Sequence, residues 1–130
     1  MFEGTIPTEI GKLNELQRLN LRRNLNITGT IPTELGKCKS LKNFALESSR
    51  VEGTIPPQLF DATKLEWLFL LDNKLIGTIP SNLGQLQNLV TCKFSCKSIE
   101  KKLNSHFPLS HIYHSCRGYQ QIKRINSKRN

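Results

Sequence analysis

One four-residue word, Gly-Thr-Ile-Pro, constrains the fold of this 130-residue chain more than any other feature of the sequence. The word begins at four positions: Gly4, Gly29, Gly53 and Gly77. Consecutive copies are 25, 24 and 24 residues apart. Self-similarity at such a period is the signature of a repeat architecture, in which each unit packs only against its neighbours.

Each unit also carries the same apolar positions after its proline. Two of these positions alternate with a period of two residues, as the inward side chains of a short strand do. The inward pairs are Leu19 with Leu21, Phe44 with Leu46, Leu68 with Leu70, and Cys92 with Phe94. The proline suits the start of a short helical turn, because it lacks the N–H that would need a partner there. The turn is expected to end at a glycine with positive φ, at Gly11, Gly36 and Gly84.

With these residues aligned, the sequence resembles a leucine-rich repeat of the form, about 24 residues long, that is typical of plant receptor kinases and their soluble relatives. The matching pattern is L-x-x-L-x-x-L-x-L-x-x-N-x-L-x-G-x-I-P-x-x-L-G, and it covers residues 4–100. The resemblance implies an α/β repeat fold. This fold is a right-handed leucine-rich-repeat solenoid with a parallel sheet on the concave face, short helical turns on the convex side and a second short strand near the Gly-x-Ile-Pro word.

The predicted division of the chain is a repeat region, 1–100, and a basic tail, 101–130. The repeat region holds about four units, which start near the four glycines of the word. The tail abandons the repeat and is expected to be irregular and disordered. Because the first unit lacks the N-terminal cap usual in the extracellular family, further repeats or a neighbouring chain are expected on that edge. The chain is accordingly interpreted as a fragment of a receptor-like or polygalacturonase-inhibitor-like protein.

The resemblance also gives a structural role to one asparagine in each unit, a position kept by Asn24 and Asn73. Their side chains are expected to bond backbone groups of the next repeat that otherwise stay unpaired. Ser49 replaces the asparagine in the second unit and can do part of that job. Lys97 replaces it in the fourth unit and cannot, since burying an unpaired ammonium is costly.

Ligand recognition, by the same resemblance, falls on the exposed positions around the inward pairs. Read across the units, these positions form four columns: Arg18, Asn43, Trp67 and Thr91; Asn20, Ala45, Phe69 and Lys93; Arg22, Glu47, Leu71 and Ser95; Arg23, Ser48, Asp72 and Cys96. The predicted ligand-binding residues are Arg18, Asn20, Arg22, Trp67, Phe69, Leu71 and Asp72. An exposed apolar patch usually contacts a partner, and the arginines beside it suit an anionic group. Three interpretations stay open: a ligand patch, a patch covered by the tail or a neighbouring chain, and an error in the column register.

The predicted function is a non-catalytic binding module that recognises a protein, peptide or glycan in receptor-like signalling or defence. Size limits the partner, because four strands give a face of roughly 300 Å² and a stable interface takes about 800 Å² per partner. One alternative is a truncated or structural repeat fragment without independent function. A second alternative is a basic tail that binds nucleic acid or an anionic membrane.

The charge of +9 is unevenly distributed. Residues 1–100 carry 12 basic and 10 acidic side chains, whereas residues 101–130 carry seven basic and none acidic. Charge confined to a tail argues against nucleic acid as the partner of the whole molecule. No apolar run reaches the length of a membrane helix, and the first residues show no signal peptide. An extracellular or membrane-associated location is therefore implied by the resemblance alone.

The remaining candidates are cysteines, a sequon and a histidine group. Cys38 and Cys92 occupy leucine positions and are expected to be small buried residues. Cys96 and Cys116 lie outside the core pattern, and a disulfide between them is possible in an oxidising compartment. Asn26 opens an Asn-Ile-Thr glycosylation sequon, which has meaning only in a secreted protein.

Neither a metal, a cofactor nor an enzymatic activity is expected. The three histidines lie in the tail with a spacing, H-x4-H-x2-H-x-C, that matches no zinc module: His106, His111, His114 and then Cys116. The sequence contains no glycine-rich phosphate loop, no H-E-x-x-H and no G-x-S-x-G. Its acidic residues are scattered singly, not paired for acid–base chemistry.

Overall fold

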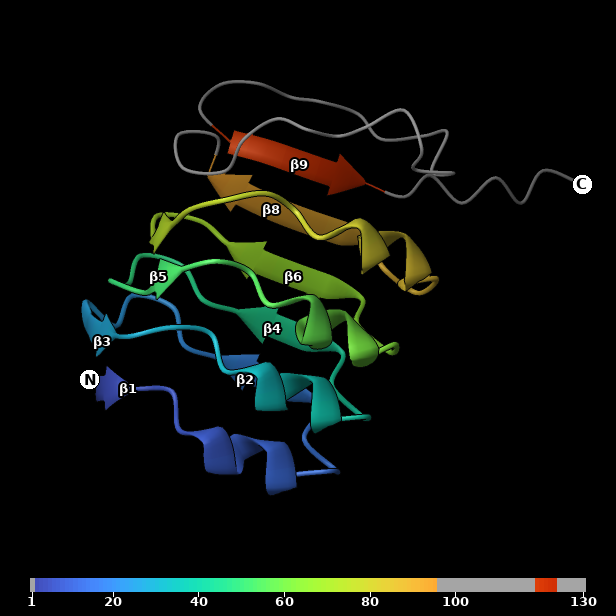
Figure 1. The fold of residues 1–130 in the computed structure, drawn as a ribbon, viewed down its shortest axis with the longest axis horizontal. Helices are drawn as coiled ribbons and strands as arrows, with labels where there is room; N and C mark the ends of the chain where they lie inside the picture. Colours follow the sequence, from blue (N-terminus) through green and yellow to red (C-terminus); the bar gives the residue numbers. More distant parts are fainter. Residues whose placement is uncertain (1, 96–118, 124–130) are drawn as a thin grey trace, which may run out of the picture.

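The computed structural model describes residues 2–95 and 119–123, and residues 2–95 form successive coils that stack on one another (Figure 1). The strands are β1 (Glu3–Thr5), β2 (Arg18–Asn20), β3 (Asn26–Thr28), β4 (Asn43–Ala45), β5 (Glu52–Gly53), β6 (Trp67–Leu70), β7 (Lys74–Leu75), β8 (Thr91–Ser95) and β9 (Tyr119–Lys123). The 3-10 helices are η1 (Thr8–Lys12), η2 (Thr33–Lys37), η3 (Pro57–Asp61) and η4 (Ser81–Gln85). Each coil thus supplies one strand to a main sheet and one helical turn to the opposite side.

The main sheet has the strand order β2-β4-β6-β8-β9, and its first four strands are parallel. The register pairs Leu19 with Phe44, Phe44 with Leu68, and Leu68 with Cys92. The predicted alignment of the units is therefore confirmed, and so is the leucine-rich-repeat solenoid. Two smaller parallel pairs, β1-β3 and β5-β7, lie beside the Gly-Thr-Ile-Pro words and confirm the expected second short strand.

The last strand of the main sheet, β9, runs antiparallel to β8. Thr91 lies opposite Lys123 and Ser95 opposite Tyr119, so the pairing extends over the whole of β8. The sequence predicts no regular structure in this tail, and for residues 119–123 the structure differs from that expectation. The other tail residues, and Lys97, lie outside the described residues.

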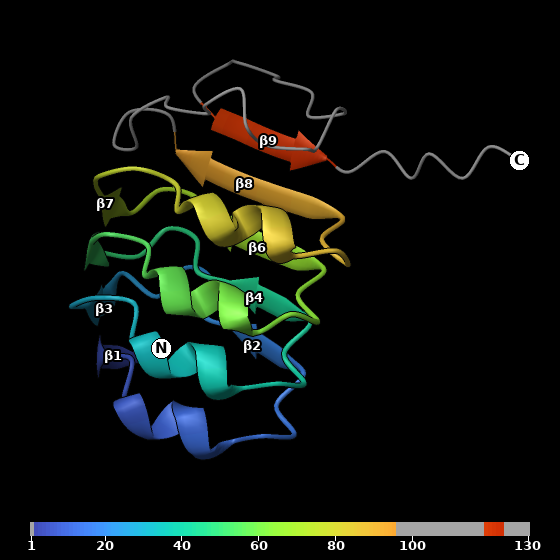
Figure 2. The ribbon, with the colours of Figure 1, turned by 45° about the vertical axis from the view of Figure 1, so that its right-hand side comes forward.

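The helical turns stack in one column against the sheet (Figure 2). Each turn begins directly after the proline of its word, whose carbonyl accepts the first hydrogen bond, as from the Ile10 N–H to Pro7 at 3.2 Å. Each helical element is only five residues long. This length suits the 3-10 form, whose hydrogen bonds join residues three apart and which occurs in short pieces. No helix in the described ranges has the length and hydropathy to cross a membrane.

The expectation that Gly11, Gly36 and Gly84 end the turns with positive φ is wrong. In the described part of the chain, the glycines with positive φ are those that open the word, at 77° to 92°. Gly11 and Gly36 are instead required by a close approach between neighbouring turns. A Cβ on Gly36 would overlap the carbonyl oxygen of Gln58, and a Cβ on Gly11 would lie 2.8 Å from the carbonyl oxygen of Glu34.

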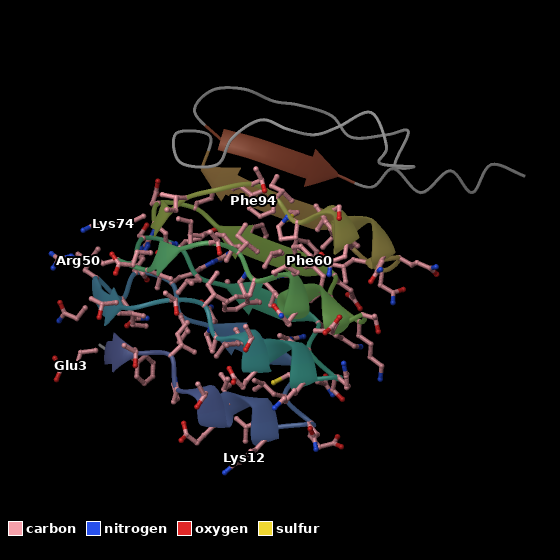
Figure 3. The ribbon with its side chains drawn as sticks, viewed as in Figure 1. Glu3, Lys12, Arg50, Phe60, Lys74 and Phe94 are labelled. Atoms are coloured by element: carbon pink, nitrogen blue, oxygen red, sulfur yellow. The ribbon has the colours of Figure 1, made fainter. Side chains whose placement is uncertain are left out.

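The apolar core lies between the sheet and the turns. Phe60 and Phe94 point into it and are fully buried, whereas Glu3, Lys12, Arg50 and Lys74 point outward (Figure 3). Among the described residues β2 is the first strand of the main sheet, and the inward leucines there, Leu16, Leu19 and Leu21, are only partly buried. Phe2 and Leu13 at this edge are 66% and 52% exposed. This edge therefore exposes apolar side chains, although Ile6 and Ile10 in the same unit are buried.

Candidate functional site

The candidate site lies on the outward face of the main sheet, where the register brings the predicted columns together. Arg18, Asn43, Trp67 and Thr91 are successive partners across β2, β4, β6 and β8. Asn20, Ala45, Phe69 and Lys93 form the next column in the same way. The register of these two columns is the one that the sequence predicts.

Two aromatic side chains of β6 form one wall of the site. Trp67 is 41% exposed, and its ring centroid lies 6.1 Å from that of the half-buried Phe69, with the rings tilted by 56°. An aromatic pair at this separation and tilt is favourable beyond the area that it buries. Trp67 therefore presents an apolar surface to solvent from a position that its neighbour helps to fix.

Two cations approach Phe69 from the two sides of β6. The guanidinium carbon of Arg22 lies 4.8 Å from the ring centroid, and the ammonium nitrogen of Lys93 lies 5.4 Å from it. Both distances are within the range of a cation–π interaction. The Nε atom of Arg22 also lies 3.1 Å from a carboxylate oxygen of Glu47, so the charge of Arg22 is balanced in place. No ion pair joins Arg18 to any residue that the structure describes.

A hollow of about 330 Å³ lies between these walls. Its lining comes from the strands β2, β4 and β6 and from Arg22, which follows β2. The lining residues are Arg18, Leu19, Asn20, Arg22, Asn43, Phe44, Ala45, Trp67 and Phe69. The hollow exists because β4 presents the short side chains of Asn43 and Ala45 between the long side chain of Arg18 on β2 and the aromatic side chains of Trp67 and Phe69 on β6. Its volume falls at the lower end of the range for small-ligand sites.

Five of the seven predicted binding residues line this hollow: Arg18, Asn20, Arg22, Trp67 and Phe69. The two others, Leu71 and Asp72, do not line it. Asp72 has a φ of 52° and belongs to a column with Arg23 and Ser48, at 58° and 54°, where the chain bends away from the sheet. Three further residues at the site, Asn43, Ala45 and Lys93, stand in the predicted columns. The sequence alone does not mark these three residues as binding residues, because short or charged side chains are common on any exposed strand.

The asparagine positions form a ladder beside the site. Nδ2 of Asn73 donates to the carbonyl oxygens of Leu46 at 2.5 Å and Leu71 at 3.0 Å, and Oδ1 accepts from the Val51 N–H at 3.3 Å. Asn24 bonds the Arg22 carbonyl at 3.1 Å and the Phe2 N–H at 2.9 Å. The bonds run to the unit's own turn and to the preceding unit, and not to the next one as expected.

Ser49, at the same position of the second unit, makes fewer hydrogen bonds than the asparagines, as the sequence predicts. Its hydroxyl donates one bond of 3.5 Å to the Leu21 carbonyl. Cys38 and Cys92 are buried free cysteines, as predicted. Burial raises the pKa of both thiols, that of Cys92 most strongly. The thiol of Cys38 donates to the Ile10 carbonyl at 3.2 Å.

The other candidates do not contribute to this site. Asn26 is exposed on β3, and its glycosylation stays a prediction. Cys96, Cys116 and the three histidines lie outside the described residues, so neither the disulfide nor the tail cluster is placed. Within the described part of the chain, no three metal-ligating side chains come together.

Comparison with known proteins bears on both the fold and the site. The family model for the Leucine Rich Repeat matches residues 15–38 and 64–86. The ectodomain of the receptor kinase SOBIR1 from Arabidopsis thaliana matches with 36% identity and a TM-score of 0.62, over 67% of this chain and 46% of that one. The chain is a leucine-rich-repeat protein of the type found in plant receptor kinases.

Two further structures resemble this leucine-rich-repeat chain. The plant peptide hormone receptor RGFR1, in complex with RGF2, is 39% identical with a TM-score of 0.64, over 68% of this chain and 14% of that one. A plant ice-binding protein is 41% identical with a TM-score of 0.64, over 67% of this chain and 28% of that one. The chain spans less than half the length of each of these three structures. A comparison with curated proteins finds no match.

Proposed function

We propose that this leucine-rich-repeat chain is a non-catalytic binding module that holds a short peptide segment against the hollow over β4. The observation that carries the proposal is the exposed Trp67 beside a hollow of about 330 Å³ on the outward face of the sheet. The peptide complex of RGFR1, a structure with the same repeat fold, supports it. The ice-binding protein has this fold as well, so the fold alone does not assign the ligand, and the site must do so.

A peptide fits the dimensions better than a folded protein does. The hollow can take one or two side chains, whereas a stable interface with a folded protein needs about 800 Å² on each partner. The cations around the hollow favour an anionic ligand over a neutral glycan, which gains nothing from them. The lining holds no His, Cys or carboxylate, the groups that transfer protons or attack substrates near neutral pH, and this supports binding over catalysis.

A library of short random peptides displayed on phage tests the proposal, with the full chain immobilised as bait. Peptides that bind through the hollow should be enriched on the native chain and lost on Trp67→Ala. Ile76→Ala is the matched control, because it also truncates an exposed apolar side chain, 58% exposed, at a position that does not line the hollow. The absence of peptides that prefer the native chain over Trp67→Ala would refute this function.

A further inference from the structure

The hollow has two walls of different chemistry. This difference restricts the ligand more than the volume of the hollow does. The wall from β2 is cationic and polar, with Arg18 and Asn20, and the wall from β6 is aromatic, with Trp67 and Phe69. Arg22, which follows β2, reaches across to the ring of Phe69. We infer, resting on the proposed function, that the hollow selects a peptide segment with an acidic and an aromatic side chain two positions apart. Ala45 between the walls provides the depth that the segment needs.

The acidic side chain is assigned to Arg18 because the other cations at the site already have partners. Arg22 pairs with Glu47 and lies over Phe69, and Lys93 lies over the same ring. Arg18 is exposed and has no ion pair with any described residue. A carboxylate that binds Arg18 therefore gains a charge-assisted hydrogen bond without displacing a partner within this part of the chain.

The aromatic side chain is assigned to Trp67 by the same reasoning. Phe69 is half-buried and already in contact with two cations, whereas Trp67 keeps 41% of its surface exposed. An aromatic ring seated over β4 can pack against the free surface of Trp67. The small Ala45 leaves room for it, where a longer side chain in the same column would close the hollow.

The spacing of the two groups follows from the register. Arg18 and Trp67 stand in one column, two rungs apart, which is about 10 Å between backbones. Residues two apart in an extended peptide point to the same side and are about 7 Å apart. The long side chains of Arg18 and Trp67 close the remaining gap. The amide of Asn43, on the floor between them, can bond the peptide backbone.

The chain's own tail does not fit this chemistry. Residues 101–130 contain seven basic side chains and no acidic one, so the tail offers no side-chain carboxylate to Arg18. Like charges beside Arg18 and Lys93 would repel it. An acidic peptide from another molecule is therefore the occupant that the charges favour.

Fluorescence of Trp67 reports occupancy directly, because it is the one tryptophan in the sequence. The probes are the capped peptides Ac-Gly-Asp-Gly-Phe-Gly-NH2 and Ac-Gly-Phe-Gly-Asp-Gly-NH2, titrated into the full chain. Binding of either one should change the emission. Replacing its Asp by Asn should weaken binding about tenfold, and replacing its Phe by Ala should remove the response.

Variants of the chain locate the two contacts. Arg18→Gln should bind the Asp and Asn peptides equally, whereas Arg50→Gln, which removes an outward-pointing arginine away from the hollow, should keep the tenfold preference of about 1.4 kcal/mol (Figure 3). Ala45→Leu should block both peptides, and Ala45→Ser, which keeps the hollow open, should bind them normally. Thermal melting shows whether each variant is folded. Since Arg18 is exposed, its variant keeps the test decisive even if Ala45→Leu fails to fold.

The outcomes separate this inference from the proposed function. An unchanged Asp preference in Arg18→Gln would overturn the inference. The inference would also be overturned if the library peptides depended on Trp67 but carried no acidic and aromatic pair. The proposed binding function would stand in that case. A library without any Trp67-dependent peptide would instead remove the binding function.

Discussion

The methyl group of Thr5 lies directly against Gly29, so that a Cβ on this glycine would stand only 2.8 Å from the Thr5 Cγ2 atom. The same relationship links each unit to the next. Thr30 lies against Gly53 and Thr54 against Gly77, with 3.1 Å between the Cγ2 atom and the position of a Cβ in both cases. The glycine of the repeated word thus serves two needs, a positive φ and the close approach of the preceding threonine. The threonine and glycine of one word are therefore used at two different contacts between units.

Gly53→Ala should lower the free energy of unfolding by about 1–3 kcal/mol, because alanine is strained at a φ of 79° and its Cβ meets the Thr30 methyl. Urea denaturation measures the change. Adding Thr30→Ser removes the methyl and should recover the steric part but not the part due to φ. Full additivity of the two substitutions would contradict the contact described here.

Asn73→Ala should destabilise the chain by about 1–3 kcal/mol, since it leaves buried backbone groups of Leu46 and Val51 without partners. Ser49→Ala is the matched control in the neighbouring unit. It loses a single bond of 3.5 Å and should cost well under about 1 kcal/mol. Equal losses in the two variants, measured by urea denaturation, would show that the ladder does not depend on the asparagine.

The sequence predicts the rungs but not all of the contacts between them. Leu19, Phe44, Leu68 and Cys92 align because the period of the repeat fixes the register by itself. The positive φ that the sequence predicts for Gly36 is wrong, because a close approach between turns is a three-dimensional relationship that a sequence motif does not express. The strand β9 has no repeat pattern, and its pairing depends on the open edge of β8. The hollow over β4 likewise depends on the contrast between one strand and its two neighbours, and not on any residue alone.

The cation–π contact between Arg22 and Phe69 should appear as a coupling free energy of about 0.5–1 kcal/mol. A double-mutant cycle with Arg22→Gln and Phe69→Leu measures it by chemical denaturation, and Glu47 stays in place in all four proteins. Arg50→Gln combined with Phe69→Leu is the control, which should show no coupling. A coupling of zero in the first cycle would mean that the ring and the guanidinium are neighbours without energetic consequence.

Stability should fall with rising pH above about 9 through the thiol of Cys92. Burial raises the pKa of this thiol above its ordinary value of 9.0 in the folded chain, so the unfolded chain releases the proton first. Between the two pKa values the folded state binds more protons, and the free energy of unfolding should decline by up to about 1.4 kcal/mol per pH unit. Below pH 9 the thiol is protonated in both states and contributes no slope. Cys92→Ala should lose this part of the pH dependence, and an identical slope in the variant would contradict the assignment.

The pairing of β9 with β8 should protect the edge of the main sheet from exchange with solvent. A chain that ends at Gly118 lacks β9, and the β8 amides that face it should exchange faster than in the full chain. A chain that ends at Lys123 is the matched control, because it keeps β9 and removes only the last seven residues. The amides of β4, two strands away, should be unaffected in both truncations, since their partners are β2 and β6. Equal protection of β8 in the two truncated chains would mean that β9 does not close this edge, and that the repeats end at β8.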